Sequence, residues 1–74
     1  MLEKYRLNTT KYKFREEKDD KLLAFNVINA NMIFFTGKTK KFIMSLINND
    51  LSADYELDNA YINFLIKNDI IVKN

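Results

Sequence analysis

The sequence has no cysteine, no histidine and no proline, and only one glycine among its 74 residues. Without cysteine, neither a disulfide framework nor a thiolate metal site can form. Without histidine, the chain lacks the most common metal ligand and the usual general base. The turns must therefore be built largely from Asn and Asp, which tolerate left-handed backbone better than other non-glycine residues.

The residues that remain do not form a recognisable catalytic set. The carboxylate pairs Glu16-Glu17 and Asp19-Asp20 are consecutive residues in a fully charged stretch, which predicts an exposed loop and not a shielded acid–base pair. Gly37-Lys38-Thr39 is similar to the end of a phosphate-binding loop, but the upstream glycine is missing because position 32 is Met. We therefore expect a protein that is not an enzyme and uses no cofactor.

Net charge and hydropathy limit which partners and which cellular location can be expected. Twelve Lys and Arg residues against ten Asp and Glu give a net charge of +2, which is too small to require a nucleic acid partner. No apolar run approaches the roughly 20 residues that cross a bilayer. The first residues do not have the pattern of a signal peptide. The sequence thus predicts a cytoplasmic protein without a membrane partner.

The middle of the chain has the periodicity of three short strands. Residues 11–15 alternate basic and aromatic side chains, residues 16–20 form a charged hairpin loop, and residues 21–27 form a second strand. A second turn at residues 29–31 leads into an apolar third strand at residues 32–35.

Helical periodicity begins after this third strand. Thr36 is expected to cap a helix over residues 37–48 with its hydroxyl group. A closing helix over residues 60–67 would be capped by Asp58 or Ser52. Residues 51–56 have room for a turn or two of helix, and residues 70–72 can form a short β segment.

This order of elements predicts an α+β domain, in which a three-stranded antiparallel sheet is followed by two or three helices in a winged-helix-like arrangement. Residues 11–74 are expected to form this single domain. Residues 1–10 form a weakly patterned N-terminal arm, in which Leu2, Tyr5 and Leu7 can dock on it.

Two elements have more apolar surface than a small core requires. The third strand is apolar on both faces, from Met32 to Phe35. The closing helix is apolar over roughly two-thirds of its circumference. A stripe of Leu57, Tyr61 and Leu65 can face the core, which leaves Ile62 and Ile66 for another side. Either the arm or a homodimer covers this surface, or strand and helix form a groove in which an extended peptide pairs with the strand edge.

Lysines near the start of the first helix are a further unusual feature. Lys38, Lys40 and Lys41 lie at the positive end of the helix dipole, which disfavours cations there. They are either simply solvated or complement an acidic partner segment.

The segment KYKFREEKDDKLLAFNVINANMIFFTGKTKKFIMSLI, from Lys11 to Ile47, resembles the PqqD-like domains, the peptide-recognition elements of ribosomal peptide (RiPP) biosynthesis. Phe35-Thr36 stands where that family has Leu-Asn at the end of the third strand, and Phe42-Ile43 stands at its apolar helix pair. The C-terminal segment INFLIKNDIIV is similar to the closing helix of the family.

The resemblance implies a non-catalytic peptide chaperone that binds the leader segment of a precursor peptide. The leader would add to the third strand and pack on the closing helix, for use by a separate maturation enzyme of the radical-SAM, cyclase or protease type. Lys38, Lys41 and Lys67 are candidates for contacts with acidic leader residues, and Leu65→Asp is expected to abolish binding in a folded domain. The predicted peptide-binding residues are Met32, Ile33, Phe34, Phe35, Lys38, Lys41, Tyr61, Ile62, Leu65, Ile66 and Lys67.

Two other functions are compatible with the same pattern. A winged-helix nucleic-acid-binding domain has strands and helices of this size, but the closing helix has only Lys67 as a basic residue, so nucleic acid is the less favoured partner. A small interaction protein could instead form a homodimer through the same apolar surfaces, and an exposed third strand also favours domain swapping.

Overall fold

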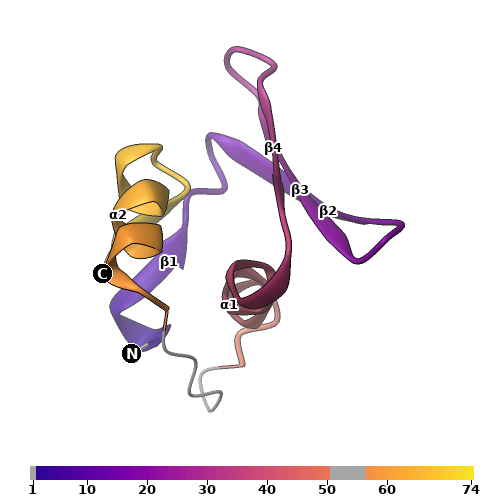
Figure 1. Ribbon diagram of the computed structural model, residues 1–74. Coiled ribbons are helices and arrows are strands. Elements are labelled where there is room, and N and C mark those ends of the chain that lie inside the picture. The colour runs from indigo at the N-terminus through magenta and orange to yellow at the C-terminus, as the bar shows by residue number, and fades with distance from the viewer. Residues whose placement is uncertain (1, 51–56) are drawn as a thin grey trace.

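The computed structural model of the chain describes residues 2–50 and 57–74, and these form an α+β domain (Figure 1). The expectations for residues 51–56, including a cap by Ser52, lie outside the described residues. The elements in chain order are η1 (Leu2–Lys4), β1 (Tyr5–Leu7), β2 (Tyr12–Glu17), β3 (Lys21–Asn26), β4 (Met32–Phe35), α1 (Gly37–Ile47), α2 (Asn59–Lys67) and β5 (Ile71–Lys73).

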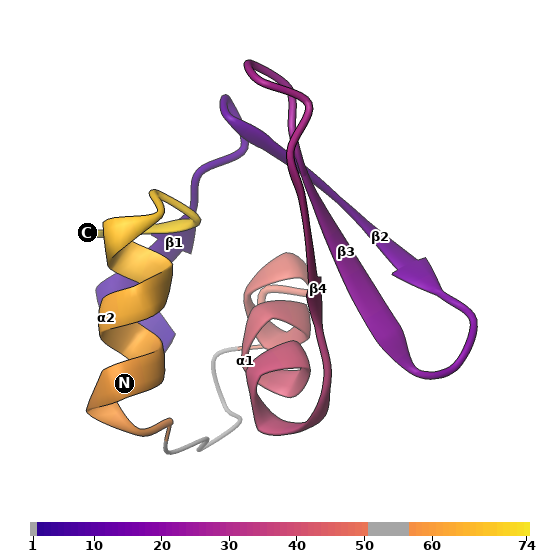
Figure 2. The same ribbon diagram turned by 45° about the horizontal axis from the view of Figure 1, so that its top comes forward.

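Strands β2, β3 and β4 form the predicted three-stranded antiparallel sheet, in the order β2-β3-β4. Its register places Phe14 beside Ala24 and Ala24 beside Ile33, so these three residues share one face. Because side chains alternate along a strand, the neighbouring positions lie on the opposite face. The sheet therefore has an inner face, which turns toward α1, and an outer face, which no described element covers (Figures 1 and 2).

Helix α1 lies between the three-stranded sheet and the layer formed by α2 and β1 (Figures 1 and 2). Phe42 and Ile43 are fully buried, as expected for the apolar pair of a core helix. Thr36 occupies the N-cap position, but its side chain makes no capping hydrogen bond, so that expectation is wrong. The chain instead turns into the helix at Gly37, whose φ of +60° lies in the left-handed region that glycine enters without steric cost.

The N-terminal residues are part of the packed domain. β1 and β5 form a two-stranded antiparallel sheet, in which Tyr5 lies beside Lys73 and Leu7 beside Ile71. Leu2 is buried, and the Tyr5 ring meets the Phe42 ring edge-on with 6.2 Å between centroids. The short β segment predicted near the C-terminus is confirmed, and residues 2–7 share the same core.

Helix α2 is rotated relative to the predicted stripe. Leu57, Ile62 and Leu65 are buried, whereas Tyr61 is 54% exposed. Ile62 and Leu65 therefore face the core, and Tyr61 does not. Asp58 stands at the N-cap of α2 but makes no capping hydrogen bond through its side chain, contrary to expectation.

The turns rely on Asp and Asn, as the scarcity of glycine predicts. Among the described residues other than glycine, a positive φ occurs at Asp19, Asp20, Ala30, Asn49 and Asp69. Four of these five are Asp or Asn, whose short polar side chains make the left-handed region accessible. The Asn26 side chain supports the β3–β4 turn by accepting a hydrogen bond from the backbone N–H of Ile28 at 2.9 Å.

Candidate functional site

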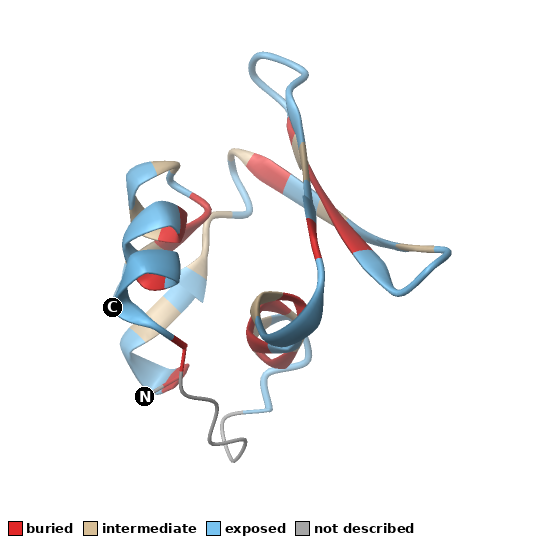
Figure 3. Cartoon of the chain, in the orientation of Figure 1, coloured by how far each residue is buried: buried red, intermediate tan, exposed pale blue. Residues whose placement is uncertain are grey.

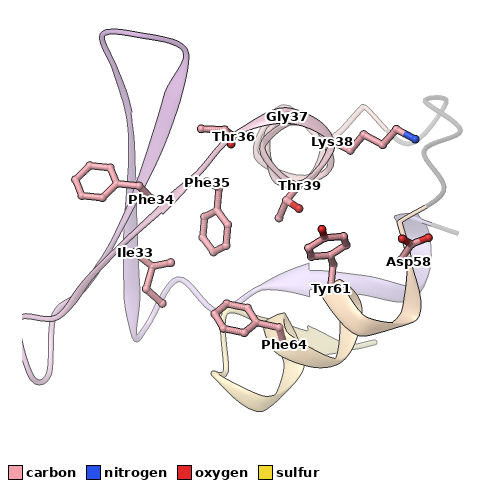
Figure 4. A pocket seen from close by; sticks show the side chains of 10 residues that line it. All are labelled: Ile33, Phe34, Phe35, Thr36, Gly37, Lys38, Thr39, Asp58, Tyr61 and Phe64. Atoms are coloured by element: carbon pink, nitrogen blue, oxygen red, sulfur yellow. The ribbon is translucent and has the colours of Figure 1, made fainter.

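A groove of about 640 Å³ runs between β4 and α2 (Figure 4). Ile33 and Phe35 enter it from β4, and Tyr61 and Phe64 face them from α2 (Figure 4). Thr39 of α1 points toward Tyr61 at one end. The lining is completed by Phe34, Thr36, Gly37, Lys38 and Asp58.

The two aromatic side chains on α2 face solvent in this structure. Tyr61 is 54% exposed and Phe64 is 44% exposed, whereas Phe35 at the floor of the groove is only 7% exposed. Figure 3 shows that α2 has both exposed and buried positions. Exposed aromatic surface beside an apolar floor is typical of a binding surface, because leaving such rings in water is unfavourable.

β4 lies at the edge of its sheet, so half of its backbone polar groups point away from β3. Asn26 donates its backbone N–H to the Asn31 carbonyl at 2.8 Å, which makes these opposed residues a hydrogen-bonded pair. Hydrogen-bonded and non-bonded pairs alternate along an antiparallel ladder. The backbone N–H and C=O groups of Ile33 and Phe35 therefore point toward β3, whereas those of Met32 and Phe34 point toward the free edge.

The position of α2 opposite this edge is fixed by contacts at its C-terminal end. The Tyr12 hydroxyl donates a hydrogen bond to the Asn68 carbonyl at 2.9 Å. Lys11 forms an ion pair with Asp69 at 2.9 Å, which raises the lysine pKa through this hydrogen bond. Ile70, directly after the helix, is fully buried. These contacts attach α2 to the beginning of β2, so the two walls of the groove belong to one packed unit.

The structure brings together only some of the predicted site residues. Five of them line the groove: Ile33, Phe34, Phe35, Lys38 and Tyr61. Met32 is 58% exposed on the outer face of the sheet, although its backbone lies at the free edge. The groove lining does not include the other five, Lys41, Ile62, Leu65, Ile66 and Lys67.

Ile62 and Leu65, which were predicted to form the wall of the groove, lie in the core instead. Leu65 is fully buried and Ile62 is 6% exposed, and Ile66 packs against the same core cluster. A carboxylate at position 65 would thus enter the core, so the burial of Leu65 argues against the expectation of a folded Leu65→Asp variant. The helical phase could have been found in the sequence, because Ile62, Leu65 and Ile66 form an aliphatic i, i+3, i+4 stripe, which is a better core stripe than one containing Tyr61.

Phe64 is the aromatic groove residue that was not among the predicted ones. It lies three positions after Tyr61, so the two rings share one helical face. The placement of Thr36, Gly37, Thr39 and Asp58 at the groove depends on how helices and strand pack, which no local sequence pattern records.

The three lysines near the start of α1 have different surroundings. Lys38 lines the groove, and Lys41 lies in a separate hollow that Met44 and Asn48 also line. Lys40 is 9% exposed and forms ion pairs with Asp20 at 2.6 Å and Glu16 at 3.8 Å. Lys40 therefore connects α1 to the β2–β3 turn, and of these three lysines only Lys38 is placed to meet a ligand in the groove.

The Lys40–Asp20 pair predicts a stability change at low pH. The hydrogen bond from Lys40 lowers the pKa of Asp20 below its ordinary value of 3.8. A lowered carboxyl pKa in the folded state adds stability above the unfolded-state pKa, and this is lost as pH falls through the folded value. We expect Asp20→Asn to reduce the thermal midpoint at pH 7, and its difference from wild type to shrink as pH falls below the ordinary value of 3.8. Asn also tolerates the left-handed φ of position 20.

Thermal melts of wild type and Asp20→Asn across pH 2–7 measure this effect, with Asp19→Asn as the matched control in the same turn. Equal melting midpoints of Asp20→Asn and wild type at pH 7 would show that the ion pair contributes nothing measurable to stability.

The described residues provide no other evident chemistry. They contain no group of three or more Asp and Glu side chains placed to hold a metal ion. Within the same residues, no helix is long and apolar enough to span a bilayer. Comparisons of the chain with family models, with curated proteins and with solved structures give no match.

Proposed function

We propose that this chain is a non-catalytic binding module, which recognises the leader segment of a ribosomally made precursor peptide and presents it to a separate modifying enzyme. The observation that carries the proposal is the free edge of β4 beside the exposed rings of Tyr61 and Phe64. Strand addition to a sheet edge, with alternate side chains entering a neighbouring groove, is an established mode of peptide recognition.

In the proposed complex, the peptide backbone pairs with Met32 and Phe34. Their two N–H donors and two carbonyl acceptors point away from β3, and neither residue is charged or a proline, so the edge lacks the usual protection against pairing. Peptide side chains opposite Ile33 point into the groove toward Tyr61 and Phe64. Those opposite Met32 and Phe34 extend the outer face of the sheet.

The groove offers enough apolar surface for a specific but reversible complex. Covering the exposed parts of Tyr61 and Phe64 removes roughly 200 Å² from water, which is favourable by about 5 kcal/mol. The edge hydrogen bonds add about 1 kcal/mol each. Ordering an extended peptide costs several kcal/mol, so the net affinity is expected to be about micromolar.

The charge at the groove is local and mixed. Lys38 and Asp58 are exposed members of the lining. An acidic leader residue near Lys38 would improve encounter rate and register more than net affinity. Lys41 and Lys67 do not line the groove, so they contribute at most to long-range attraction.

The finer aspects of this proposal are carried by the likeness of Lys11–Ile47 and the closing helix to the PqqD-like domains. These finer aspects are a winged-helix-like arrangement of sheet and helices, a cytoplasmic location, and a second partner, which is a maturation enzyme of the radical-SAM, cyclase or protease type. A nucleic acid partner is less favoured, because α2 has Lys67 as its only basic residue and Asp58 precedes its first turn.

Removing both rings from α2 tests the proposed groove. The probe is the N-terminal segment of a short open reading frame encoded beside this one. We expect Tyr61→Ser combined with Phe64→Ser to weaken binding of this leader segment at least about 100-fold. The domain should stay folded, because both side chains are exposed. Isothermal titration of wild type and variant gives the two affinities, and circular dichroism checks folding.

Ile47→Ser is the matched control, because Ile47 is a similarly exposed apolar residue at the end of α1, away from the groove lining. Undiminished leader binding by a folded Tyr61→Ser/Phe64→Ser variant would exclude the groove as the binding site. Steeply salt-dependent binding of a mixed-sequence duplex would favour the nucleic-acid function instead.

A further inference from the structure

The outer face of the three-stranded sheet has basic residues on β2 and apolar residues on β3 and β4, which is unusual for a sheet face in contact with water. One row across the strands consists of Lys13, Phe25 and Met32, and the next row consists of Arg15, Leu23 and Phe34. In each row, the residue on β2 is basic and the residues on β3 and β4 are apolar. A solvated face of an antiparallel sheet is normally polar, yet two of the three strands here present only apolar residues in these rows.

These six residues, which we call the outer sheet face, form a second surface separate from the core. Met32 and Phe34 are 58% and 54% exposed, whereas Leu23 is only 7% exposed among its neighbours. Leu23 does not belong to the main buried cluster around α1. A hollow of about 550 Å³ lies over this face, and Glu17 also borders it.

We propose that the outer sheet face docks an amphipathic helix of a second protein, with carboxylates along one flank. The apolar strip on β3 and β4 would take the apolar side of the helix, and the basic strip on β2 would meet its carboxylates. Alternate residues on a strand lie about 6.8 Å apart, as do Lys13 and Arg15 here. Carboxylates four positions apart on a helix lie about 6 Å apart along its axis, so both can reach the two cations.

The charge of this face favours such a partner over a second copy of this chain. Arg15 already forms an ion pair with Glu17 at 2.8 Å, and its guanidinium has further donors for a second carboxylate. Two copies placed face to face about a twofold axis perpendicular to the strands would bring their basic strips together, which is unfavourable. About an axis parallel to the strands, each basic strip would lie over β4 of the other copy, whose residues in these rows, Met32 and Phe34, are not acidic. A single-stranded nucleic acid, whose bases could stack on Phe25 and Phe34 beside the two cations, is the alternative occupant that the test below distinguishes.

The inference does not depend on peptide binding in the groove, and the test keeps the two apart. The probe is a synthetic helix of about 14 residues, which spans the length of a six-residue strand. It carries Leu on one side and Glu at positions four apart on the flank, and the matched probe has Lys in place of Glu. Titration of ¹⁵N,¹³C-labelled full-length protein should shift the signals of Lys13, Leu23 and Phe25, which do not line the groove, with the Glu helix and far less with the Lys helix.

The variant Lys13→Glu/Arg15→Glu should bind the Glu helix about tenfold more weakly, while its leader affinity stays that of wild type. Both side chains are exposed, so the fold is expected to persist. Equal binding of the two helices, or no shift of these signals at millimolar helix, would overturn the proposal. So would a concentration-dependent mass, or a response to single-stranded DNA, that involves the same residues.

Discussion

Replacing Leu65 by aspartate is expected to unfold the domain. Leu65 is fully buried in the cluster that joins α2 to the core residues Phe42 and Ile70. An unpaired carboxylate at such a position destabilises by more than about 4 kcal/mol, because it either stays charged in an apolar site or must take up a proton. A chain of 74 residues has a total stability of roughly 4–11 kcal/mol, so most of it would be lost.

Thermal and urea unfolding followed by circular dichroism measure this effect. Asn63→Asp is the matched control, because it places the same side chain on the exposed side of α2. A cooperative transition of Leu65→Asp at the wild-type midpoint would contradict the burial of this residue, and with it the rotation of α2 that directs Tyr61 and Phe64 into the groove.

A proline at position 34 is expected to abolish strand addition and leave the sheet intact. The Phe34 N–H points to the free edge, so the substitution removes a donor that β3 does not use. Proline is tolerated in edge strands at positions of this kind. The ring would also occupy the place of the incoming backbone. We expect leader affinity at least about tenfold below that of Phe34→Ala, which loses the same aromatic ring but keeps the N–H.

Proline at position 33 is instead expected to disrupt the sheet itself. The Ile33 N–H belongs to the ladder with β3, so this variant should lose the sheet and much of its stability. Binding titrations and thermal melts of Phe34→Pro, Phe34→Ala and Ile33→Pro together show whether the N–H groups of residues 33 and 34 point toward β3 or toward the free edge. Leader affinity of Phe34→Pro equal to that of Phe34→Ala would show that the β4 edge takes no part in binding.

The sequence allowed the local elements in the middle of the chain to be predicted well, because alternation, a charged loop, a short apolar run and helical periodicity each indicate one of them. The strand at residues 32–35 was predicted with its observed bounds, and the helix starting at Gly37 ends one residue earlier than expected. The alternation of residues 11–15 and the charged residues after them located the first hairpin, but Glu16 and Glu17 belong to β2 and not to the predicted loop. The predicted α+β class, with its three-stranded antiparallel sheet, is confirmed.

Long-range pairing and helix rotation were harder to predict. β1 and β5 have three residues each, too few for a visible period, and their partners lie at opposite ends of the chain. The rotation of α2 was missed because Tyr61 and Leu65 form a plausible stripe of their own, although the aliphatic stripe that begins at Ile62 is the better one. The burial of Ile62 and the exposure of Tyr61 show which stripe faces the core. The ion pair of Lys40 was not among the predicted alternatives, because its partner Asp20 lies 20 residues earlier in the β2–β3 turn.

Amide hydrogen exchange of β4, measured residue by residue with and without the leader segment, tests the proposed strand addition most directly. In the free protein, the amides of Ile33 and Phe35 should exchange slowly and those of Met32 and Phe34 rapidly. Saturating leader should slow exchange at Met32 and Phe34 at least about tenfold, because both become hydrogen-bonded to the added strand. Unchanged exchange at these two amides in a saturated complex would contradict strand addition at β4.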